Sequence, residues 1–465
     1  MILGLAILAA SAAAAGLRPQ PLVTGSGIKT LFTQYEAAAV YDSAGVTTKG
    51  YAVGATWLNE PEVAEIFNVT SGERARAWGR RCAAGCRPAR LVTGQASPTN
   101  CKRPPGPPRP SAAGNKTVKS INDPNFHDES VFKMDIAQQG TRSVVSKTAN
   151  GEFFSTIYLL DAATPTSGAE WNMTLPGTEV LAIAISDDGS TVAVAALAIG
   201  PTFSVFVLDA TSGQNRTEYA WPLAMATTSV QLSMSADGAY VGVLSTQGPR
   251  SIKVDVIHSS GAHSGPIINA SITSPVAQAF GMSFDGTFVA AGQATDLIVW
   301  KRAAGSPLRY QQAFQTTMSD FYVGAASISF AAKAQVMSVA WQLASNSQSQ
   351  NIVQVYDVVS GKAGLNLTLP ATTGSLVNWP TGTALSGDGS FAVMCCWGAE
   401  GRQAGAAQLQ VFDVKAGKAA GSVYTPGSMF ACGVADLESS GRTVAIAAGK
   451  HTHATVMGRG GDLVA

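Results

Sequence analysis

The chain has 465 residues, of which 46% are hydrophobic and only 13% are charged, a charged share well below that of ordinary soluble domains. Its formal net charge of +1 argues against a nucleic-acid-binding surface spread over the whole molecule. The length exceeds that of one ordinary domain, but repeat proteins reach it, and the apolar content is ample for a core.

The N-terminus begins with an apolar run, Ile2–Ala15, which is followed by Arg18 and Pro19. A run of this length is too short to span a bilayer as a helix. The small residues that end it are typical of a signal-peptidase cleavage site near Ala15. We therefore predict a signal peptide over residues 1–16 and a secreted, extracellular protein. An uncleaved membrane anchor and a buried strand are the alternatives, and no later run predicts a transmembrane helix.

Residues 79–119 differ in composition from the rest of the chain. They contain nine Lys or Arg residues, no Asp or Glu, seven of the 22 prolines and three of the six cysteines. This composition predicts a disordered basic insertion within the folded domain. Two alternatives stay open: a translated intron or gene-model error, and a basic arm that docks on an acidic surface.

A repeated pair of turns organises the remaining sequence. The unit that begins at Val180 has strand patterns over 191–197 and 203–208, separated by turns and followed by a polar strand. Its first turn, SDDG, recurs as SADG, SFDG and SGDG; Gly189, Gly238 and Gly286 are 49 and 48 residues apart. Asp-Gly suits a tight hairpin because glycine readily adopts positive φ angles. The sequence therefore predicts short antiparallel strands in repeated units.

Seven complete units and a partial eighth can be counted. The complete units begin near Tyr35, His127, Val180, Ser229, Ala279, Ala325 and Thr383, and the partial one spans about Met429 to Met457. Four short strands repeated this often predict an all-β fold, a β-propeller of eight, alternatively seven, four-stranded blades over residues 17–465. A β-sandwich array and a β-solenoid are the competing architectures.

The two turns also carry a resemblance to known proteins. SxDG followed by an apolar-Asp-x-x-Ser-Gly-Lys turn, as in VYDVVSGK ending at Lys362, resembles the WD-repeat and related quinoprotein-like propellers over about residues 30–457. The Trp-Asp pair of that family is replaced here by Leu208-Asp209, Tyr356-Asp357 and Phe412-Asp413, and by Trp300-Lys301 in one unit. The resemblance implies a fold but not a function, because propellers include both scaffolds and enzymes.

The final unit lacks an outer strand, and an exposed strand edge invites aggregation. The segment after the signal peptide has no place in the first complete unit and contains a strand-like stretch at 28–33. We therefore predict that it pairs with the C-terminal unit, beside residues 443–457, and closes the ring. The competing hypothesis is a seven-bladed ring that leaves the C-terminal fragment outside or forms no blade from the interrupted unit.

Six Asn-x-Ser/Thr sequons predict N-glycosylation of an exported chain. Four of them fall after a turn, where we expect the start of the polar outer strand of a blade. The six asparagines are Asn68, Asn115, Asn172, Asn215, Asn269 and Asn366.

The cysteines and histidines predict no metal site. Cys82, Cys86 and Cys101 lie in the basic insertion without a nearby histidine, so a local disulfide is favoured over zinc. Cys395 and Cys396 are adjacent on a strand, so at most one can meet Cys432 and the other is expected to be a buried thiol. His451 and His453 alternate, but two ligands without a third are a weak signal for a metal.

The motifs of catalysis are absent as well: the sequence contains no G-x-S-x-G elbow, phosphate-binding loop or H-E-x-x-H. Turn roles are expected for the four aspartates that recur at one position, Asp188, Asp237, Asp285 and Asp388. We therefore predict no catalytic residue, no metal ligand and no cofactor.

The favoured function is an extracellular binding or scaffold protein, because the loops of a propeller form broad end faces. Its partner is an unknown protein or glycan, with no nucleic acid and no membrane span after signal cleavage. A propeller hydrolase or lactonase with a central-channel site and a structural wall or matrix glycoprotein are the two alternatives.

Overall fold

The computed structural model describes the chain over residues 3–9, 22–24, 28–34, 40–46, 51–57, 64–68, 117–121, 130–149, 154–164, 169–198, 202–222, 227–247, 251–271, 278–293, 295–318, 322–333, 335–343, 348–349, 351–369, 372–373, 380–396, 409–424, 434–437, 443–447 and 453–459. Side chains are described for most of these residues between 133 and 422. Every regular element in these ranges is a β-strand. None of the described segments is a helix long and apolar enough to cross a membrane.

In the described part of the chain, six sheets contain four strands each, hydrogen-bonded antiparallel in chain order. They consist of β4 (Val40–Val46), β5 (Tyr51–Trp57), β6 (Ala64–Asn68) and β7 (Thr117–Ile121); β8 (Ser130–Ile136), β9 (Arg142–Ala149), β10 (Phe154–Asp161) and β11 (Trp171–Pro176); β12 (Thr178–Ile185), β13 (Thr191–Ala198), β14 (Thr202–Asp209) and β15 (Asn215–Pro222); β16 (Thr227–Met234), β17 (Tyr240–Gln247), β18 (Ser251–His258) and β19 (His263–Ser271); β20 (Gln278–Met282), β21 (Phe288–Gln293), β22 (Asp296–Arg302) and β23 (Tyr310–Thr317); and β24 (Tyr322–Phe330), β25 (Val336–Leu343), β27 (Asn351–Asp357) and β28 (Ala363–Thr368).

Two further sheets among the described residues contain five strands, and another pair of strands forms a short ribbon. The five-stranded sheets consist of β30 (Pro380–Leu385), β31 (Phe391–Cys396), β32 (Leu409–Asp413), β33 (Lys418–Tyr424) and β2 (Leu22–Thr24); and of β34 (Val434–Leu437), β35 (Thr443–Ala447), β36 (His453–Arg459), β3 (Ile28–Gln34) and β1 (Leu3–Ala9). The ribbon pairs β26 (Gln348–Ser349) with β29 (Thr372–Thr373).

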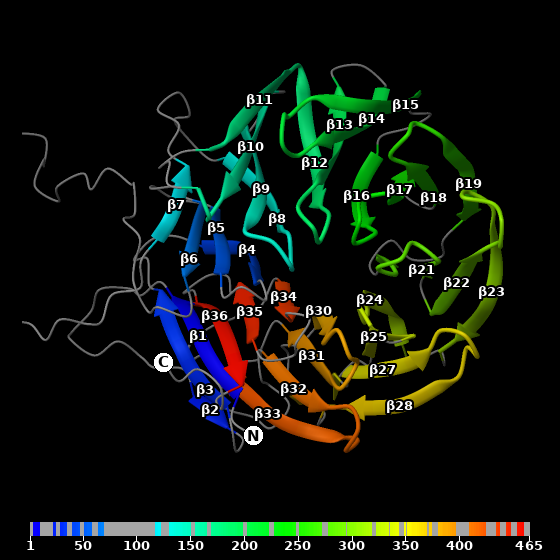
Figure 1. Ribbon diagram of the computed structural model, residues 1–465. Helices are drawn as coiled ribbons and strands as arrows, with labels where there is room; N and C mark the ends of the chain where they lie inside the picture. Colours follow the sequence, from blue (N-terminus) through cyan, green and yellow to red (C-terminus); the bar gives the residue numbers. More distant parts are fainter. Residues whose placement is uncertain are drawn as a thin grey trace, which may run out of the picture.

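The sheets are arranged around a central axis, with the first strand of each repeat innermost and the last at the rim (Figure 1). Because each sheet is covered by a neighbour on both faces, its middle strands are apolar on both faces, as in TVAVAALA of β13. One core layer, between the sheets β12–β15 and β16–β19, contains Val205, Val207, Val241 and Val243. The core therefore lies between neighbouring sheets rather than on the axis.

The two ends of the chain meet in one sheet. β3 pairs antiparallel with β36, with Ile28 opposite Arg459 and Thr33 opposite Thr455. This confirms the prediction that the segment after the signal peptide provides the missing strand of the C-terminal unit. One part of that segment lies elsewhere, because β2 pairs with β33 of the preceding sheet.

Strand β1 lies within the predicted signal peptide and also pairs with β36. Leu5 of β1 and Thr30 of β3 have the same partner, Met457. Loss of residues 1–16 on cleavage would therefore leave β3 in place as the closing strand. Cleavage itself stays a prediction.

The interrupted repeat forms a four-stranded sheet. β6 pairs with β7 across the basic insertion, with Glu65 opposite Ser120. The last three residues of the predicted insertion, 117–119, therefore belong to a strand, in keeping with the alternation of TVKSI. Residues 79–116 lie outside the described residues. The number of blades, eight or seven, stays a prediction.

Candidate binding face at the hairpin turns

Hairpin turns at one end of the sheets form the described end face of the molecule, which we call the turn face. It consists of the first turns, which join the first and second strands of a sheet, and the second turns, which join the third and fourth. In antiparallel sheets both kinds of turn lie at the same end. The described turn face includes residues 137–141, 186–190, 235–239, 283–287, 331–333 and 386–390 of the first turns, and 209–214, 258–262, 303–309, 357–362 and 413–417 of the second turns.

Each SxDG first turn is stabilised by its own serine and aspartate. The Ser186 hydroxyl donates to Asp188 Oδ1 at 2.6 Å, and the same carboxylate oxygen accepts from the Ser190 N–H at 2.9 Å. The Thr191 N–H in turn donates to Ser186 Oγ at 3.0 Å. The same contacts recur in the SADG, SFDG and SGDG turns. The predicted turn role of the four aspartates is thereby confirmed.

Two of the turn glycines also allow neighbouring sheets to approach closely. Gly238 has a φ of +67°, and a Cβ placed on it would lie 2.4 Å from Thr191 of the preceding sheet. Gly286 has a φ of +64°, and its Cβ would lie 2.6 Å from the ring of Tyr240. Glycine is therefore required both by the backbone conformation and by the packing of one sheet against the next.

Backbone hydrogen bonds join successive first turns around the axis. The Gln139 N–H donates to the Asp187 carbonyl at 3.1 Å and the Asp188 N–H to the Ala236 carbonyl at 3.2 Å. Ala236 then donates to Phe284 at 2.7 Å. These bonds connect four consecutive sheets, so the inner part of the turn face is a continuous hydrogen-bonded arc. The Lys333 N–H donates to the Gly387 carbonyl at 2.6 Å in the same way.

The second turns use an aspartate at the position that follows the apolar strand. Asp209 Oδ1 accepts from the N–H groups of Thr211 and Ser212, both at 2.9 Å. Asp357 makes the equivalent contacts with Val359 and Ser360. The aspartate of the WD-like pair therefore has a turn-capping role even though the tryptophan is replaced.

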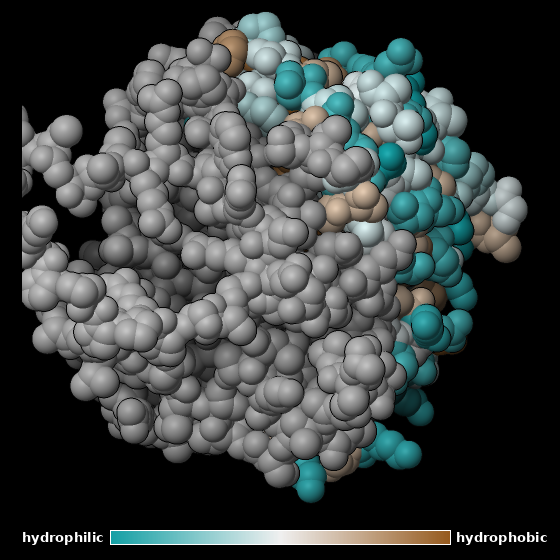
Figure 2. Space-filling view, turned by 60° about the vertical axis from the view of Figure 1, so that its left-hand side comes forward, coloured by the Kyte–Doolittle hydropathy of each residue, from teal (hydrophilic) through white to brown (hydrophobic). Residues whose placement is uncertain are grey.

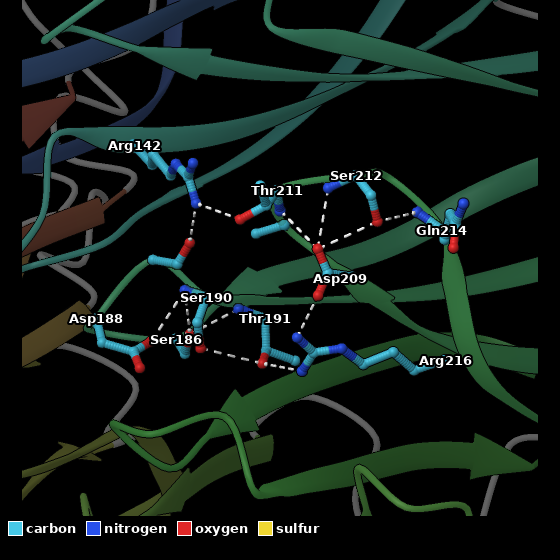
Figure 3. A network of polar contacts seen from close by, with 12 residues as sticks. Arg142, Ser186, Asp188, Ser190, Thr191, Asp209, Thr211, Ser212, Gln214 and Arg216 are labelled. Atoms are coloured by element: carbon cyan, nitrogen blue, oxygen red, sulfur yellow. Dashed lines mark hydrogen bonds and ion pairs between the residues drawn. The ribbon is translucent and has the colours of Figure 1, made fainter.

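Arginine side chains connect neighbouring turns (Figure 3). Arg142 of β9 donates to the Gly189 carbonyl of the next sheet at 3.0 Å and lies 3.6 Å from Asp161 Oδ2. Arg216 of β15 bonds to Asp209 and donates to Thr191 Oγ1 at 3.1 Å. These contacts hold the hairpins in fixed positions relative to one another, so the turn face is a preorganised polar surface.

Hydrogen bonds lower the pKa values of two carboxylates of the turn face, Asp188 and Asp209. The hydrogen bond from Arg216, followed by that from the Ser212 N–H, lowers the pKa of Asp209 to about 2. Burial raises the pKa of Asp188, but hydrogen bonds from Ser186 and Ser190 outweigh it, so that this pKa lies below its ordinary value. Hydrogen bonds to the charged form have this effect because they stabilise the carboxylate. Among the described residues, no group of three or more His, Cys, Asp or Glu could hold a metal ion.

The inner strands are joined by a second set of contacts across sheet boundaries. Asp135 Oδ2 of β8 accepts from the Ile185 N–H of β12 at 2.9 Å. Ser233 Oγ accepts from the Met282 N–H at 3.0 Å. Ser329 Oγ accepts from Leu385 in the same manner at 3.1 Å. The polar residues of the inner strands therefore serve at these positions to align one sheet with the next.

Three of the predicted glycosylation sites have exposed asparagines on rim strands: Asn172 on β11, Asn215 on β15 and Asn366 on β28. Asn269 lies on the rim strand β19, Asn68 ends the third strand β6, and Asn115 lies outside the described residues. The expected position at the start of a strand is wrong for Asn269 and Asn366, because β19 and β28 begin directly after the preceding turn, at His263 and Ala363. Glycosylation itself stays a prediction.

The adjacent cysteines have different states. Cys395 is disulfide-bonded, and its partner lies outside the described residues. Cys396 is a buried free thiol with Asn351 Nδ2 3.8 Å from its sulfur, and burial raises its pKa far above the ordinary value. The expectation of one buried thiol in this pair is confirmed.

No protein-family model and no curated protein sequence matches the chain. Solved structures match its fold. The C-terminal WD40 domain of Sif2 aligns with a TM-score of 0.55 and 10% identity, covering 93% of this chain and 99% of that chain. Sqt1 from Saccharomyces cerevisiae aligns with a TM-score of 0.55 and 10% identity, covering 95% of this chain and 99% of that chain. The chain therefore has a WD-repeat-like β-propeller fold, as its turns predicted.

Sequence reasoning did not find the residues that join the sheets. Arg142 joins two sheets through the Gly189 carbonyl, 47 residues away, and Arg216, which was also missed, links Thr191 and Asp209 within its own sheet. Trp171 Nε1 donates to the Ala210 carbonyl at 2.7 Å, also between sheets. The only available signal was that these side chains occupy positions next to strand ends.

Proposed function

We propose that this chain is an exported, glycosylated scaffold that binds a protein partner through the turn face. The observation that supports this most strongly is the WD-repeat-like propeller fold, found at full length in the WD40 domain of Sif2. The fold supports the proposal by analogy only, because propellers serve several functions. The preorganised turn face adds to it, because a surface held in one conformation loses little entropy on binding.

The rim is the less suitable surface for a protein partner. Most of its described residues are exposed or half-buried, and most of the exposed ones are polar, as in YQQAFQTT of β23. Figure 2 shows hydrophilic residues over most of the described surface in that view, with scattered hydrophobic ones. Three exposed sequon asparagines lie on the rim, and glycans there would hinder contact. Val359, which is 53% exposed, lies on the turn face instead.

Export is supported by two observations besides the leader. A disulfide at Cys395 is typical of an oxidising compartment. The exposed Asn172 and Asn366 each have an exposed threonine two residues later, on the same face of the strand. We expect the mature chain from a eukaryotic secretory host to begin near Leu17 and to lose mass on enzymatic deglycosylation. Cytosolic retention without glycans would contradict the export proposal while leaving partner binding open.

The binding proposal is tested by photo-crosslinking. A benzophenone amino acid is placed at Lys333 or Lys362 of the turn face, or at the exposed rim residue Gln312 as a matched control, and the protein is irradiated in the extracellular fluid of its source. We expect a defined adduct from the two turn-face positions and none from Gln312. The crosslinked polypeptide is then purified and titrated against the unlabelled chain.

The titration decides between specific and incidental adducts. For the specific case we expect Kd in the range of about 1 μM to 10 nM, typical of standard interfaces. Lys333→Glu combined with Lys362→Glu should weaken binding at least tenfold, and Gln312→Glu should leave it unchanged. Equal adducts from all three positions, or no measurable affinity, would contradict binding through the turn face.

A further inference from the structure

One charged residue is buried in the seam between the sheets β12–β15 and β16–β19. Asp255 of β18 is 1% exposed, and its Oδ2 lies 3.1 Å from Lys253 Nζ on the same strand. Its other oxygen, Oδ1, is buried without a hydrogen-bond partner. A buried carboxylate with an unpaired oxygen is costly, because desolvation is only partly offset by one ion pair.

The position of Asp255 in the repeat shows that the charge is not required by the fold. It stands three residues before the residue that opens the second turn. The residues at this position in the described third strands are Glu65, Tyr158, Phe206, Asp255, Ile298, Gln354, Gln410 and Thr455. Six of these eight residues are uncharged, and only Glu65 and Asp255 are acidic. Departures from a repeat rule that weaken stability are candidates for function.

The surroundings of Asp255 come from four strands. Ser245 of β17 lies diagonally across the strand pair, and its hydroxyl is also buried without a partner. His263 of β19 stacks on Tyr219 of β15, in the preceding sheet, with ring centroids 4.0 Å apart. The charges of Lys253 and His263 both act on the Asp255 carboxylate, and that carboxylate acts on Tyr219.

No other described side chain facing Asp255 titrates. On the side of the preceding sheet, β14 contributes Phe203, Val205 and Val207 to this core layer. On its own sheet, β17 contributes Val241 and Val243. The carboxylate therefore titrates in an apolar seam, with Lys253, His263 and Tyr219 as the ionisable groups around it.

We propose that Asp255 makes this seam sensitive to pH, so that the two sheets hold together more tightly in mildly acidic solution than at neutral pH. Protonation turns the carboxylate into a neutral carboxylic acid, so the seam no longer contains this buried negative charge. The seam opens more readily when Asp255 is ionised. Because Tyr219 and His263 lie on strands at the rim, opening would begin there.

The direction follows from linkage. Burial, which outweighs the opposing charges of Lys253 and His263, raises the pKa of Asp255 above its ordinary value of 3.8. The folded chain therefore binds this proton more tightly than the unfolded chain does. The stabilising contribution is complete below pH 3.8 and is lost as the pH rises through the raised pKa. The lowered pKa values of Asp209 and Asp388 act in the opposite direction, but only as the pH falls below 3.8.

The test is urea unfolding of the full chain as a function of pH, together with amide hydrogen exchange in β15 and β18. We compare the unfolding equilibrium constant of the wild type at pH 7.5 and at about pH 4.5. It should fall as the pH is lowered, by about tenfold for each pH unit of this range that lies below the pKa of Asp255 in the folded chain. Protection of the seam amides should rise in parallel, whereas amides of the remote sheet β24–β28 should not change. Asp255→Asn, which is nearly isosteric, should remove this rise.

Two further variants serve as controls for folding and for the identity of the titrating group. Asp255→Gln places at this site the residue that the repeats already accept at Gln354 and Gln410, so it serves if the Asn variant fails to fold. His263→Gln should retain the pH response, because the titrating group is Asp255. Parallel pH curves for the wild type and both Asp255 variants would overturn the proposal. Loss of the response in His263→Gln alone would assign it to the histidine and would also overturn the proposal.

Discussion

The close approach of neighbouring turns predicts a large difference between two glycine-to-alanine substitutions. Gly238 and Gly305 have similar backbone conformations, with φ of +67° and +74°. A Cβ on Gly238 would lie 2.4 Å from Thr191 of the preceding sheet, whereas a Cβ on Gly305 would meet nothing within 4 Å. Gly305→Ala therefore isolates the backbone strain, and Gly238→Ala adds the overlap between sheets.

The magnitudes follow from these two contributions. The left-handed conformation costs a non-glycine residue about 1–2 kcal/mol. Overpacking of a tight contact costs about 1–3 kcal/mol more. We therefore expect Gly305→Ala to lower the free energy of unfolding by about 1–2 kcal/mol and Gly238→Ala by about 2–5 kcal/mol.

Urea unfolding is the appropriate assay. At about 2.1 cal/mol/K per residue, a chain of 465 residues has an unfolding entropy of about 1 kcal/mol/K, so each kcal/mol moves the melting temperature by only about 1 °C. The m-value should stay constant, which shows that the surface exposed on unfolding is unchanged. Equal losses for the two variants would refute the inference that Gly238 lies against Thr191 in a sheet-to-sheet contact.

Three further predictions concern closure, the rim and acid stability. Deletion of residues 17–33 removes β2 and most of β3, so it should lower the urea midpoint of the whole domain; an unchanged midpoint would contradict closure by terminal pairing. Single Asn→Gln changes at exposed rim sequons should each reduce the mass of the exported protein by one glycan without altering its unfolding, as read by mass spectrometry of variants at Asn172, Asn215 and Asn366. Arg216→Met removes the main cause of the lowered pKa of Asp209. In the wild type, the stability that this carboxylate contributes is present above pH 3.8 and is lost as the pH falls towards about 2, so the variant should unfold in acid at a higher pH. An unchanged acid-unfolding midpoint would show that this ion pair has no effect on stability.

The repeated turns were predictable because their determinants are local. In SDDG, the serine, the aspartate and the glycine all act within five residues, as the bonds from Ser186 to Asp188 and from Thr191 to Ser186 show. Chain closure was predictable for a different reason: the last unit lacked a strand, and one strand-like segment was left over. In both cases the sequence pattern was compatible with only a few local structures or strand pairings.

The contacts between sheets could not be predicted, because they join residues whose proximity is set by the ring rather than by sequence spacing. The bond from Arg142 to the Gly189 carbonyl is an example, and the pairing of β2 with β33 within one sheet is set by the ring in the same way. The burial of Asp255 could not be predicted either, because aspartate is rarely buried unless it is paired. The starts of β19 and β28 were placed too late because these strands begin directly after the preceding turns, at His263 and Ala363.

Binding through the turn face is tested most directly by amide hydrogen exchange on the complex between this chain and the polypeptide that crosslinks to it. The account predicts that partner binding slows exchange in the first and second turns, including residues 235–239, 331–333 and 357–362, and leaves the rim strands β15 and β23 unchanged. Slowed exchange confined to the rim strands, with the turns unaffected, would contradict it.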